Sequence, residues 1–224
     1  NGKMWKVNIN KTNGLKEGTK IIFDGSIMLT GKIISHGGED FIMEFYTKYD
    51  LPFNKVMEEI GLAPLPPYIK RNPSDKDLNK KDKIHYQTIY AKSNGSIAAP
   101  TAGLHFTENL LEKIKSLGIN IVEIMHHIGK GTFKPIKTNI VESHKMEKEY
   151  FEISPDVAEI INKAKKDGKR IISVGTSTTR ALETAADNDG SIKPMNNCSS
   201  LFIHSGYKFK IIDLFGGQED LRNR

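Results

Sequence analysis

A proline-rich step at Pro64, Pro66 and Pro67 divides the chain into two stretches with different patterns of apolar residues. Before it, short β-like runs are separated by glycine-containing turns, a pattern typical of antiparallel sheets. After it, strand-like runs alternate with helical patterns, which is typical of α/β proteins. We therefore expect a small β-barrel-like domain over residues 1–62, a proline- and lysine-rich connection over 63–84, and an α/β domain over 85–224.

The β-like runs of the first stretch predict an antiparallel meander that closes into a small barrel. They read "MWKVNI", "TKIIF", "SIMLTGKII" and "DFIMEFY". The clearest hairpin signal is Gly37-Gly38 between the last two runs, because a tight hairpin turn needs residues that accept a positive φ. A short helix follows these runs, and we expect it to end at Gly61.

The second stretch contains paired helix-start and helix-stop signals. Thr107 is a predicted N-cap for the helix "ENLLEKIKSL", which Gly118 ends. Ser154 and Pro155 begin a second helix that ends at Gly168, and "TSTTRALETAAD" is a third. The predicted strands are "HYQTIYA", "INIVEIM", "RIISVG" and "YKFKIID". This alternation favours a mostly parallel sheet or barrel, with ligands at the carboxyl ends of its strands.

Three segments rich in small residues follow predicted strands: "AAPTAGLHFT", "HHIGKGTFKP" and "VGTSTTR". Glycine at 129 and 131 lets the backbone approach a ligand closely, although ordinary turns would use glycine in the same way. Gly175 and the hydroxyl residues after it offer donors at a helix N-terminus, which suits an anion or simple N-capping. Their spacings fit neither a phosphate-binding P-loop nor a dinucleotide fingerprint, and there is no G-x-S-x-G nucleophile elbow.

Charge and cysteine content narrow the class of protein. The 224 residues include 33 Lys and Arg against 27 Asp and Glu, a net charge of +6, which favours a polyanionic partner or a lysine-rich solvated surface. Cys198 is the only cysteine, so an internal disulfide framework is excluded and a reducing, cytoplasmic location is expected. No apolar run is long enough to span a bilayer, and the first ten residues lack the apolar core of a signal peptide.

Histidines near the expected strand ends are candidates for proton transfer. His105, His127 and His144 carry imidazoles that titrate near neutral pH, but a single histidine in such a place is more often a packing or surface residue. Their spacing does not match a metal-binding motif, so no metal is expected. Arg180 could pair with a carboxylate or phosphate, or lie exposed beside Glu183 three residues later.

Six blocks in order carry a resemblance to a known family: "PLPPYI", "YQTIYA", "AAPTAGLHFT", "HIGKGTFKPI", "VGTSTTRALE" and "LFIHSGYKFKIID". Together they resemble the S-adenosylmethionine:tRNA ribosyltransferase-isomerases of queuosine biosynthesis. The resemblance implies a distorted α/β barrel-like domain with an inserted small antiparallel β-barrel domain. It also implies that the ribosyl part of S-adenosylmethionine is transferred and isomerised onto 7-aminomethyl-7-deazaguanine at the tRNA wobble position. Epoxyqueuosine-tRNA would form, with release of adenine and methionine.

The resemblance, together with side-chain chemistry, suggests the site residues. The catalytic candidates are His105, His127 and Glu149, with Glu147 behind them. The substrate-binding candidates are Thr101, Ala102, Gly103, Gly129, Gly131, Thr132, Phe133, Gly175, Thr176 and Arg180. S-adenosylmethionine would be a co-substrate, without a prosthetic group, and the protein a monomer. The tRNA phosphates would meet lysines and arginines, from Lys76, Lys80, Lys81 and Lys83 or from residues 163–170.

The sequence also departs from the family pattern. It opens at Asn1 without a methionine and joins "GGQEDL" directly to Phe215, so we expect that it lacks parts of the full-length protein. Glu147 stands where the family often has a histidine, and His126 where it is usually apolar. Two other functions stay open: a noncatalytic tRNA-binding homologue, or another S-adenosylmethionine-dependent RNA-modifying enzyme such as a methyltransferase.

Overall fold

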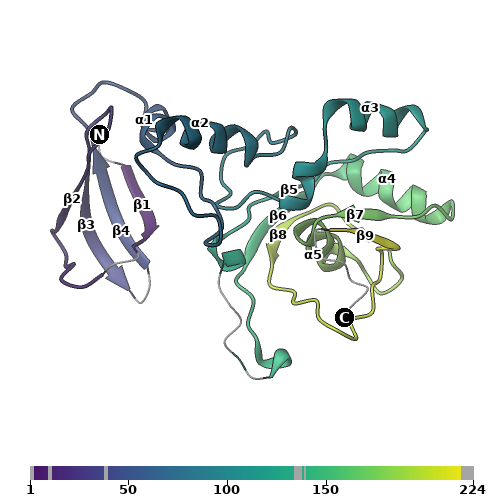
Figure 1. Cartoon of the computed structure of the whole chain (residues 1–224). Helices are drawn as coiled ribbons and strands as arrows, with labels where there is room; N and C mark the ends of the chain where they lie inside the picture. Colours follow the sequence, from purple (N-terminus) through teal and green to yellow (C-terminus); the bar gives the residue numbers. More distant parts are fainter. Residues whose placement is uncertain (1–2, 10–11, 38–39, 134–137, 139, 218–224) are drawn as a thin grey trace. The chain divides into compact units, whose positions relative to one another are not determined.

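The protein is a mixed α/β chain with several antiparallel strand pairings (Figure 1). The computed structural model describes residues 3–9, 12–37, 40–133, 138 and 140–217. Its backbone divides into two compact units, Asn1–Leu62 and Ala63–Arg224, which are described here one after the other.

The first unit is a four-stranded antiparallel sheet with one helix. The strands are β1 (Lys3–Asn8), β2 (Lys20–Phe23), β3 (Leu29–Gly37) and β4 (Asp40–Tyr46), in the order β1-β4-β3-β2. The predicted antiparallel strands are therefore present, but their order is not that of a simple meander, because β1 pairs with β4. Alternate residues of β3 and β4, such as Ile33 and Met43, are buried against Phe53 and Val56 of α1 (Phe53–Ile60).

Glycines end two of the elements in this unit. β3 and β4 pair directly from Gly37 opposite Asp40, as the hairpin prediction requires. Gly37 does not have a positive φ, however, and Gly38 lies outside the described residues. Gly61 ends α1 as predicted, and its N–H donates a hydrogen bond of 2.9 Å to the carbonyl oxygen of Met57.

The strands of the second unit form two small sheets. In the first, β5 (Met125–His126), β6 (Glu149–Ile153) and β8 (Met195–Ser199) are antiparallel. In the second, β7 (Ile172–Val174) and β9 (Leu214–Gly216) are parallel. The expectation of a mostly parallel sheet is therefore wrong for the part of the unit that the structure describes. The physical reason is that the described residues between β5 and β6 form single-turn 3₁₀ helices and no crossover α-helix, which a parallel pair normally requires.

Of the four helices described in this unit, the last three lie where their sequence signals predict. The four are α2 (Lys76–His85), α3 (Glu108–Ser116), α4 (Pro155–Lys166) and α5 (Thr176–Ala185). The Thr107 hydroxyl caps α3 by accepting the Leu110 N–H at 3.2 Å. Gly118 and Gly168 follow α3 and α4 with φ of +74° and +66°, the left-handed conformation that ends helices. The α2 helix begins inside the segment that was expected to be a connection, residues 63–84, and ends at His85.

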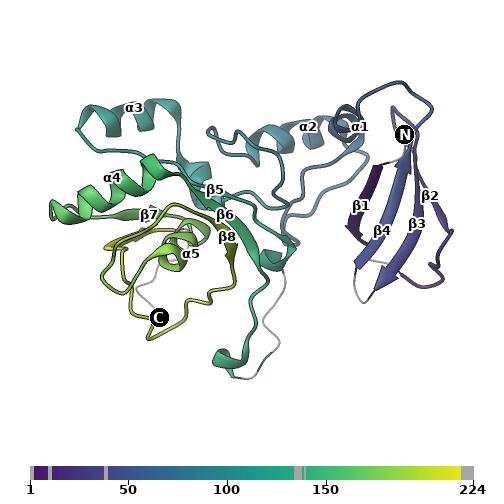
Figure 2. The ribbon, with the colours of Figure 1, turned by 180° about the vertical axis from the view of Figure 1, so that it is seen from behind.

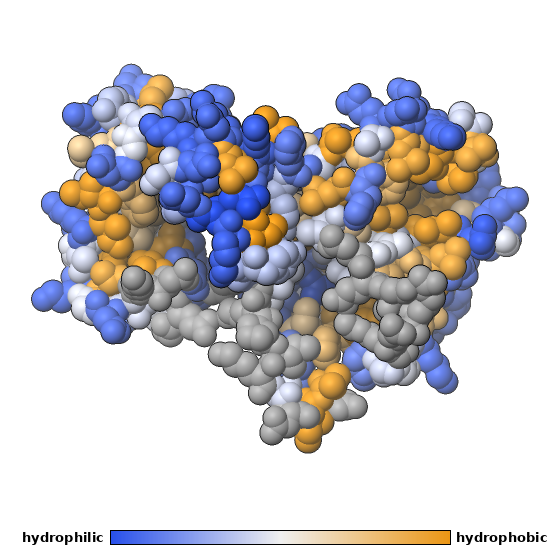
Figure 3. Space-filling model, in the orientation of Figure 1, coloured by the Kyte–Doolittle hydropathy of each residue, from blue (hydrophilic) through white to orange (hydrophobic). Residues whose placement is uncertain are grey.

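The core of the second unit forms between α4, α5 and the strands (Figures 1 and 2). Phe151 and Ile153 of β6, Ile161 of α4 and Ala181 of α5 are buried in it. α5 packs against β5, β7 and β8. By contrast, α3 buries none of its residues, and apolar side chains appear at the surface of this unit in Figure 3.

Three predicted strands are absent or shorter in the structure. "HYQTIYA" contains the end of α2 followed by turns, and only Met125 of "INIVEIM" enters a strand. "YKFKIID" is not a strand, although its apolar residues suggested one. The reason lies in Glu183 of α5, which is buried and accepts the N–H groups of Lys210, Ile211 and Ile212 at 2.9, 3.2 and 3.2 Å. A side chain thus replaces the strand that would otherwise accept these hydrogen bonds.

Candidate functional site

The three segments rich in small residues lie together in the second unit. The first forms a 3₁₀ helix, η1 (Thr101–His105), next to the start of α5, since a Cβ on Gly175 would lie 3.8 Å from the Cβ of Ala102. The chain just before η1 runs beside the second segment, because the Ile97 N–H donates a 2.8 Å hydrogen bond to the Ile128 carbonyl. The site can therefore be built from residues that are far apart in the sequence.

A buried carboxylate connects these segments. Glu149 begins β6 and is only 3% exposed, and its buried charge is paired with the guanidinium of Arg180 from α5. Its Oε1 accepts the Gly129 N–H at 2.8 Å and the Thr132 hydroxyl at 3.4 Å. Its Oε2 lies 3.3 Å from Nε2 of His126 on β5. Both carboxylate oxygens are therefore occupied, so Glu149 is placed to hold other groups in position.

Burial decides the charge state of the groups around Glu149. It lowers the pKa of His126 to about 4, and the nearby positive charge of Arg180 acts in the same direction, while the Ser177 backbone opposes the shift. Burial also lowers the pKa of Arg180, but an arginine stays charged because its ordinary pKa is far above neutral. At neutral pH the cluster thus contains a neutral imidazole and a charged guanidinium.

A cavity of about 450 Å³ adjoins this cluster and shares His126 with it. Pro100 at the start of η1, His127 after β5, and Ser177 and Thr178 in the first turn of α5 line it. Tyr86, Thr88 and Tyr90 of the "YQTIYA" block add further wall residues, followed by Lys92, Ser96, Glu123, Glu152 and Ser154. The wall combines aromatic rings with hydroxyl, carboxylate and imidazole groups, a composition suited to a polar heterocyclic ligand.

Several of the predicted site residues meet in this region. Glu149, Arg180, Gly129 and Thr132 belong to the buried cluster. His127 lines the cavity, and its ring stacks on Tyr150 with 5.6 Å between the ring centroids.

The other predicted residues serve the packing of the loops or lie away from the cluster. Gly131 lies close to Glu147, because a Cβ there would be 3.0 Å from the Glu147 Cβ. Gly103 is buried against Thr88 and Tyr90, and a Cβ would overlap the Tyr90 hydroxyl. His105, at the end of η1, and Thr176, at the start of α5, are exposed. Thr101 begins η1 and Phe133 ends a second 3₁₀ helix (Lys130–Phe133), but the Phe133 side chain lies outside what the structure describes.

Sequence reasoning missed His126 as a site residue. The residue drew attention only as a departure from an apolar position, whereas the structure buries it beside Glu149. The available signal for His126 was its position directly before His127, at the end of an apolar run. Successive strand residues point to opposite sides, and both sides can border a site. Tyr86 and Tyr90 were likewise expected to lie in a strand and instead line the cavity.

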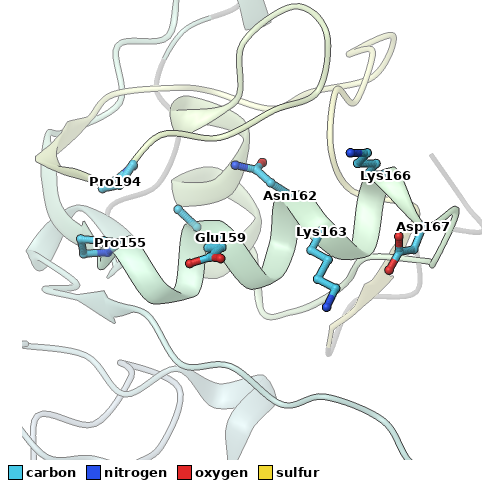
Figure 4. Close-up of a pocket in the computed structure, with 8 residues that line it drawn as sticks. Pro155, Glu159, Asn162, Lys163, Lys166, Asp167 and Pro194 are labelled. Atoms are coloured by element: carbon cyan, nitrogen blue, oxygen red, sulfur yellow. The ribbon is translucent and has the colours of Figure 1, made fainter.

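A second hollow, of about 640 Å³, follows the outer side of α4 (Figure 4). Its lining combines Glu159 and Asp167 with Lys163 and Lys166, so it carries charges of both signs. None of these residues belongs to the cluster around Glu149. We therefore place the candidate site at the smaller cavity, where buried polar groups converge.

Two searches of the described residues gave negative results. Within the described ranges, His, Cys, Asp and Glu side chains form no group of three or more that could hold a metal ion. No helix in the same part of the chain is both long and apolar enough to cross a membrane.

Comparison with known proteins found a matching family model and several similar relatives. Residues 1–216 match the model of a family described as "Queuosine biosynthesis protein". A protein of Halothermothrix orenii named S-adenosylmethionine:tRNA ribosyltransferase-isomerase is 46% identical over 212 residues, 94% of this chain and 59% of the relative. A protein of the same name from Clostridioides difficile is 43% identical over 210 residues, 93% of this chain and 59% of the relative.

A crystal structure of an S-adenosylmethionine tRNA ribosyltransferase from Thermotoga maritima is also similar, with 22% identity and a TM-score of 0.37. The match covers 94% of this chain and 53% of that one. The chain thus spans somewhat more than half the length of the relatives that it matches.

Proposed function

The chain belongs to the queuosine biosynthesis protein family, and from this premise we propose that it is part of an S-adenosylmethionine:tRNA ribosyltransferase-isomerase. The proposed reaction transfers the ribosyl moiety of S-adenosylmethionine to 7-aminomethyl-7-deazaguanine at the wobble position of tRNA and isomerises it. Epoxyqueuosine-tRNA is formed, and adenine and methionine are released. The observation that carries the proposal is the cavity next to the buried His126–Glu149–Arg180 cluster, lined by residues from five of the six blocks that resemble this family.

The reaction needs groups that move protons and groups that hold the substrates. The attacking amine must be a free base, a proton must leave the activated ribose, and adenine must be protonated as it departs. We propose His127, in the cavity wall, and His105 for this acid–base work. Glu149 is better suited to positioning, because four donors already contact its two oxygens.

The remaining residues of the three segments are proposed to form the substrate cradle. Gly129, Gly131 and Gly175 allow the backbone to approach a ligand, and Thr132, Thr176 and Arg180 offer polar contacts. The first turn of α5 borders the cavity through Ser177 and Thr178. The positive end of this helix favours an anionic group, such as the carboxylate of S-adenosylmethionine. Thr101, Ala102, Gly103 and Phe133 complete the proposed cradle.

The wider architecture follows as part of the proposal. The first unit would be the small inserted β-barrel domain, residues 63–84 the connection, and residues 85–224 an incomplete part of a distorted α/β barrel. S-adenosylmethionine would be a co-substrate, without a prosthetic group or metal, and the enzyme a cytoplasmic monomer. Lysines of α2 and of residues 163–170 would meet tRNA phosphates, so binding should weaken as salt is raised.

One incubation tests the proposal. The full-length protein that contains this chain is mixed with S-adenosylmethionine and tRNA carrying 7-aminomethyl-7-deazaguanine, and the products are separated by chromatography. We expect free adenine and methionine in equal amounts. S-adenosylhomocysteine would indicate a methyltransferase, and salt-sensitive tRNA binding without either product would indicate a noncatalytic homologue; both results contradict the proposal.

Histidine variants then assign the acid–base groups. We expect His127→Ala and His105→Ala each to slow adenine release by at least 100-fold, the usual contribution of a general acid or base. His85→Ala, at the exposed end of α2, is the matched control and should keep full activity. Unchanged turnover in His105→Ala would remove His105 from the mechanism. This is the more demanding of the two tests, because His105 is exposed.

A further inference from the structure

Two polar atoms beside Glu149 have no hydrogen-bond partner although both are buried. They are Nδ1 of His126 and Nε of Arg180, and neither finds a partner anywhere in the described part of the chain. The His126 side chain is 7% exposed, so bulk solvent reaches it only slightly. A buried polar atom left unpaired is costly, and in native proteins it commonly marks a place where something else binds.

The contact with Glu149 indicates which ring nitrogen of His126 carries the proton. Glu149 is paired with Arg180 and can only accept hydrogen bonds as a carboxylate, so the nearby Nε2 of His126 must carry the ring proton. Nδ1 then has a free lone pair. The lowered pKa of His126, about 4, agrees with this neutral form, since roughly one ring in a thousand would be charged at pH 7.

The surroundings of His126 indicate what could supply the missing donor. His126 lines the 450 Å³ cavity together with Ser177 and Thr178, whereas its other ring nitrogen is occupied by Glu149. A free lone pair beside the positive charge of Arg180 does not favour a cationic donor such as an ammonium group. An uncharged O–H or N–H group suits the position, and nucleosides carry both in their ribose hydroxyls and exocyclic amines.

We propose that His126 is a ligand-binding residue: Glu149 holds its Nε2–H, and its Nδ1 accepts a hydrogen bond from a hydroxyl or amino group of a nucleoside in the cavity. The identity of that nucleoside as S-adenosylmethionine rests on the proposed function. Burial lowers the pKa of His126, so its imidazole is a weak base and is not charged to act as an acid near neutral pH. Its contribution is to affinity and orientation.

Two substitutions separate the two nitrogens of the ring. His126→Asn keeps an acceptor near the position of Nδ1 and removes the donor to Glu149. His126→Gln keeps a donor near the position of Nε2 and removes the acceptor. We measure the Kd of S-adenosylmethionine for each variant of the full chain by isothermal titration calorimetry, with His85→Asn as an exposed control and thermal melting as the check of folding.

The expected result is an asymmetry between the variants. His126→Gln should raise Kd by roughly 3- to 10-fold, as the loss of one hydrogen bond does, and its Kd should exceed that of His126→Asn at least threefold. An equal or reversed order, or a wild-type chain that binds no S-adenosylmethionine, overturns the inference. A chain that shows the expected order but releases no adenine refutes the proposed function alone.

A spectroscopic readout tests the same atom without relying on variants. In the full chain labelled with ¹⁵N-histidine, we expect His126 Nδ1 to be unprotonated at pH 7 and its resonance to move when S-adenosylmethionine is added. A protonated Nδ1, or a resonance that does not respond to a saturating ligand, contradicts the proposal. A merely structural role for His126 would leave this resonance unchanged on ligand addition.

Discussion

Replacing Glu183 by glutamine should destabilise the second unit even though the change is nearly isosteric. The carboxylate is 1% exposed and accepts four hydrogen bonds, three from backbone N–H groups and one from the Tyr207 hydroxyl at 3.1 Å. A glutamine oxygen placed at Oε1 still accepts from Ile211 and Ile212. Its amide nitrogen then faces the Lys210 N–H, and two donors cannot bond to each other.

The magnitude follows from these contacts. Tyr207 can rotate its hydroxyl and accept from the new amide, so one backbone N–H, that of Lys210, loses its acceptor at a cost of about 1–3 kcal/mol. The remaining bonds lose the strength that a charged acceptor gives them, while removing a buried charge returns part of the cost. We expect a net loss of about 2–4 kcal/mol in the free energy of unfolding, and a fall in Tm of about 4–16 °C for a unit of this size.

Urea unfolding followed by circular dichroism measures this loss directly, as a lower midpoint at an unchanged slope. Glu159→Gln is the matched control, because Glu159 lies exposed on α4 and its substitution removes the same charge. If Glu183→Gln and Glu159→Gln both stay within about 0.5 kcal/mol of the wild type, the usual range for surface substitutions, the role assigned to Glu183 is refuted.

Three further predictions follow from the same unit. Burial, and then the charge and hydrogen bond of Glu183, raise the pKa of Tyr207 to about 12. The protonated Tyr207 hydroxyl should thus stabilise the fold fully below pH 10, and this stabilisation should be lost as the pH rises through 12. Absorbance titration should show a lower Tyr207 pKa in Glu183→Gln, and an unchanged Tyr207 pKa would contradict the contact with Glu183. Gly103→Ala should destabilise the unit, because the new Cβ overlaps the Tyr90 hydroxyl, and Tyr90→Phe should restore part of the loss; no restoration in a double-mutant cycle would count against this packing. Arg180→Met should lower the free energy of unfolding by about 3–5 kcal/mol, because it leaves Glu149 buried without its cation, and adding Glu149→Gln should recover part of this loss. Strictly additive losses of the two single variants in urea unfolding would exclude the ion pair.

Local signals predicted the helices better than the strands. Thr107, Pro155 and the left-handed glycines act within one or two turns, so the helix boundaries can be predicted from neighbouring residues alone. The apolar run "YKFKIID" looked equally convincing as a strand. Its backbone instead bonds to Glu183, about 28 residues earlier in the chain, and no local pattern reveals such a partner.

The candidate site shows the same division. The family resemblance and residue type were enough to select Glu149, Arg180 and Gly129 as candidates, and the structure brings these three together. The roles of single side chains depend on distances. His105 belongs to the most distinctive block yet lies exposed, whereas His126 occupies a position expected to be apolar and contacts Glu149.

The contacts of Glu149 also determine how the region should form and open. Its partners come from β5, from the loop after β5 and from α5, so the carboxylate is satisfied only when all three have docked. Opening any one of them exposes a charged group that the others cannot satisfy, which couples their local unfolding. The amide hydrogen of Gly129, bonded to Glu149 at 2.8 Å, should therefore exchange with solvent only when the whole assembly opens. Its exchange rate would report on the integrity of the pocket in the absence of any substrate.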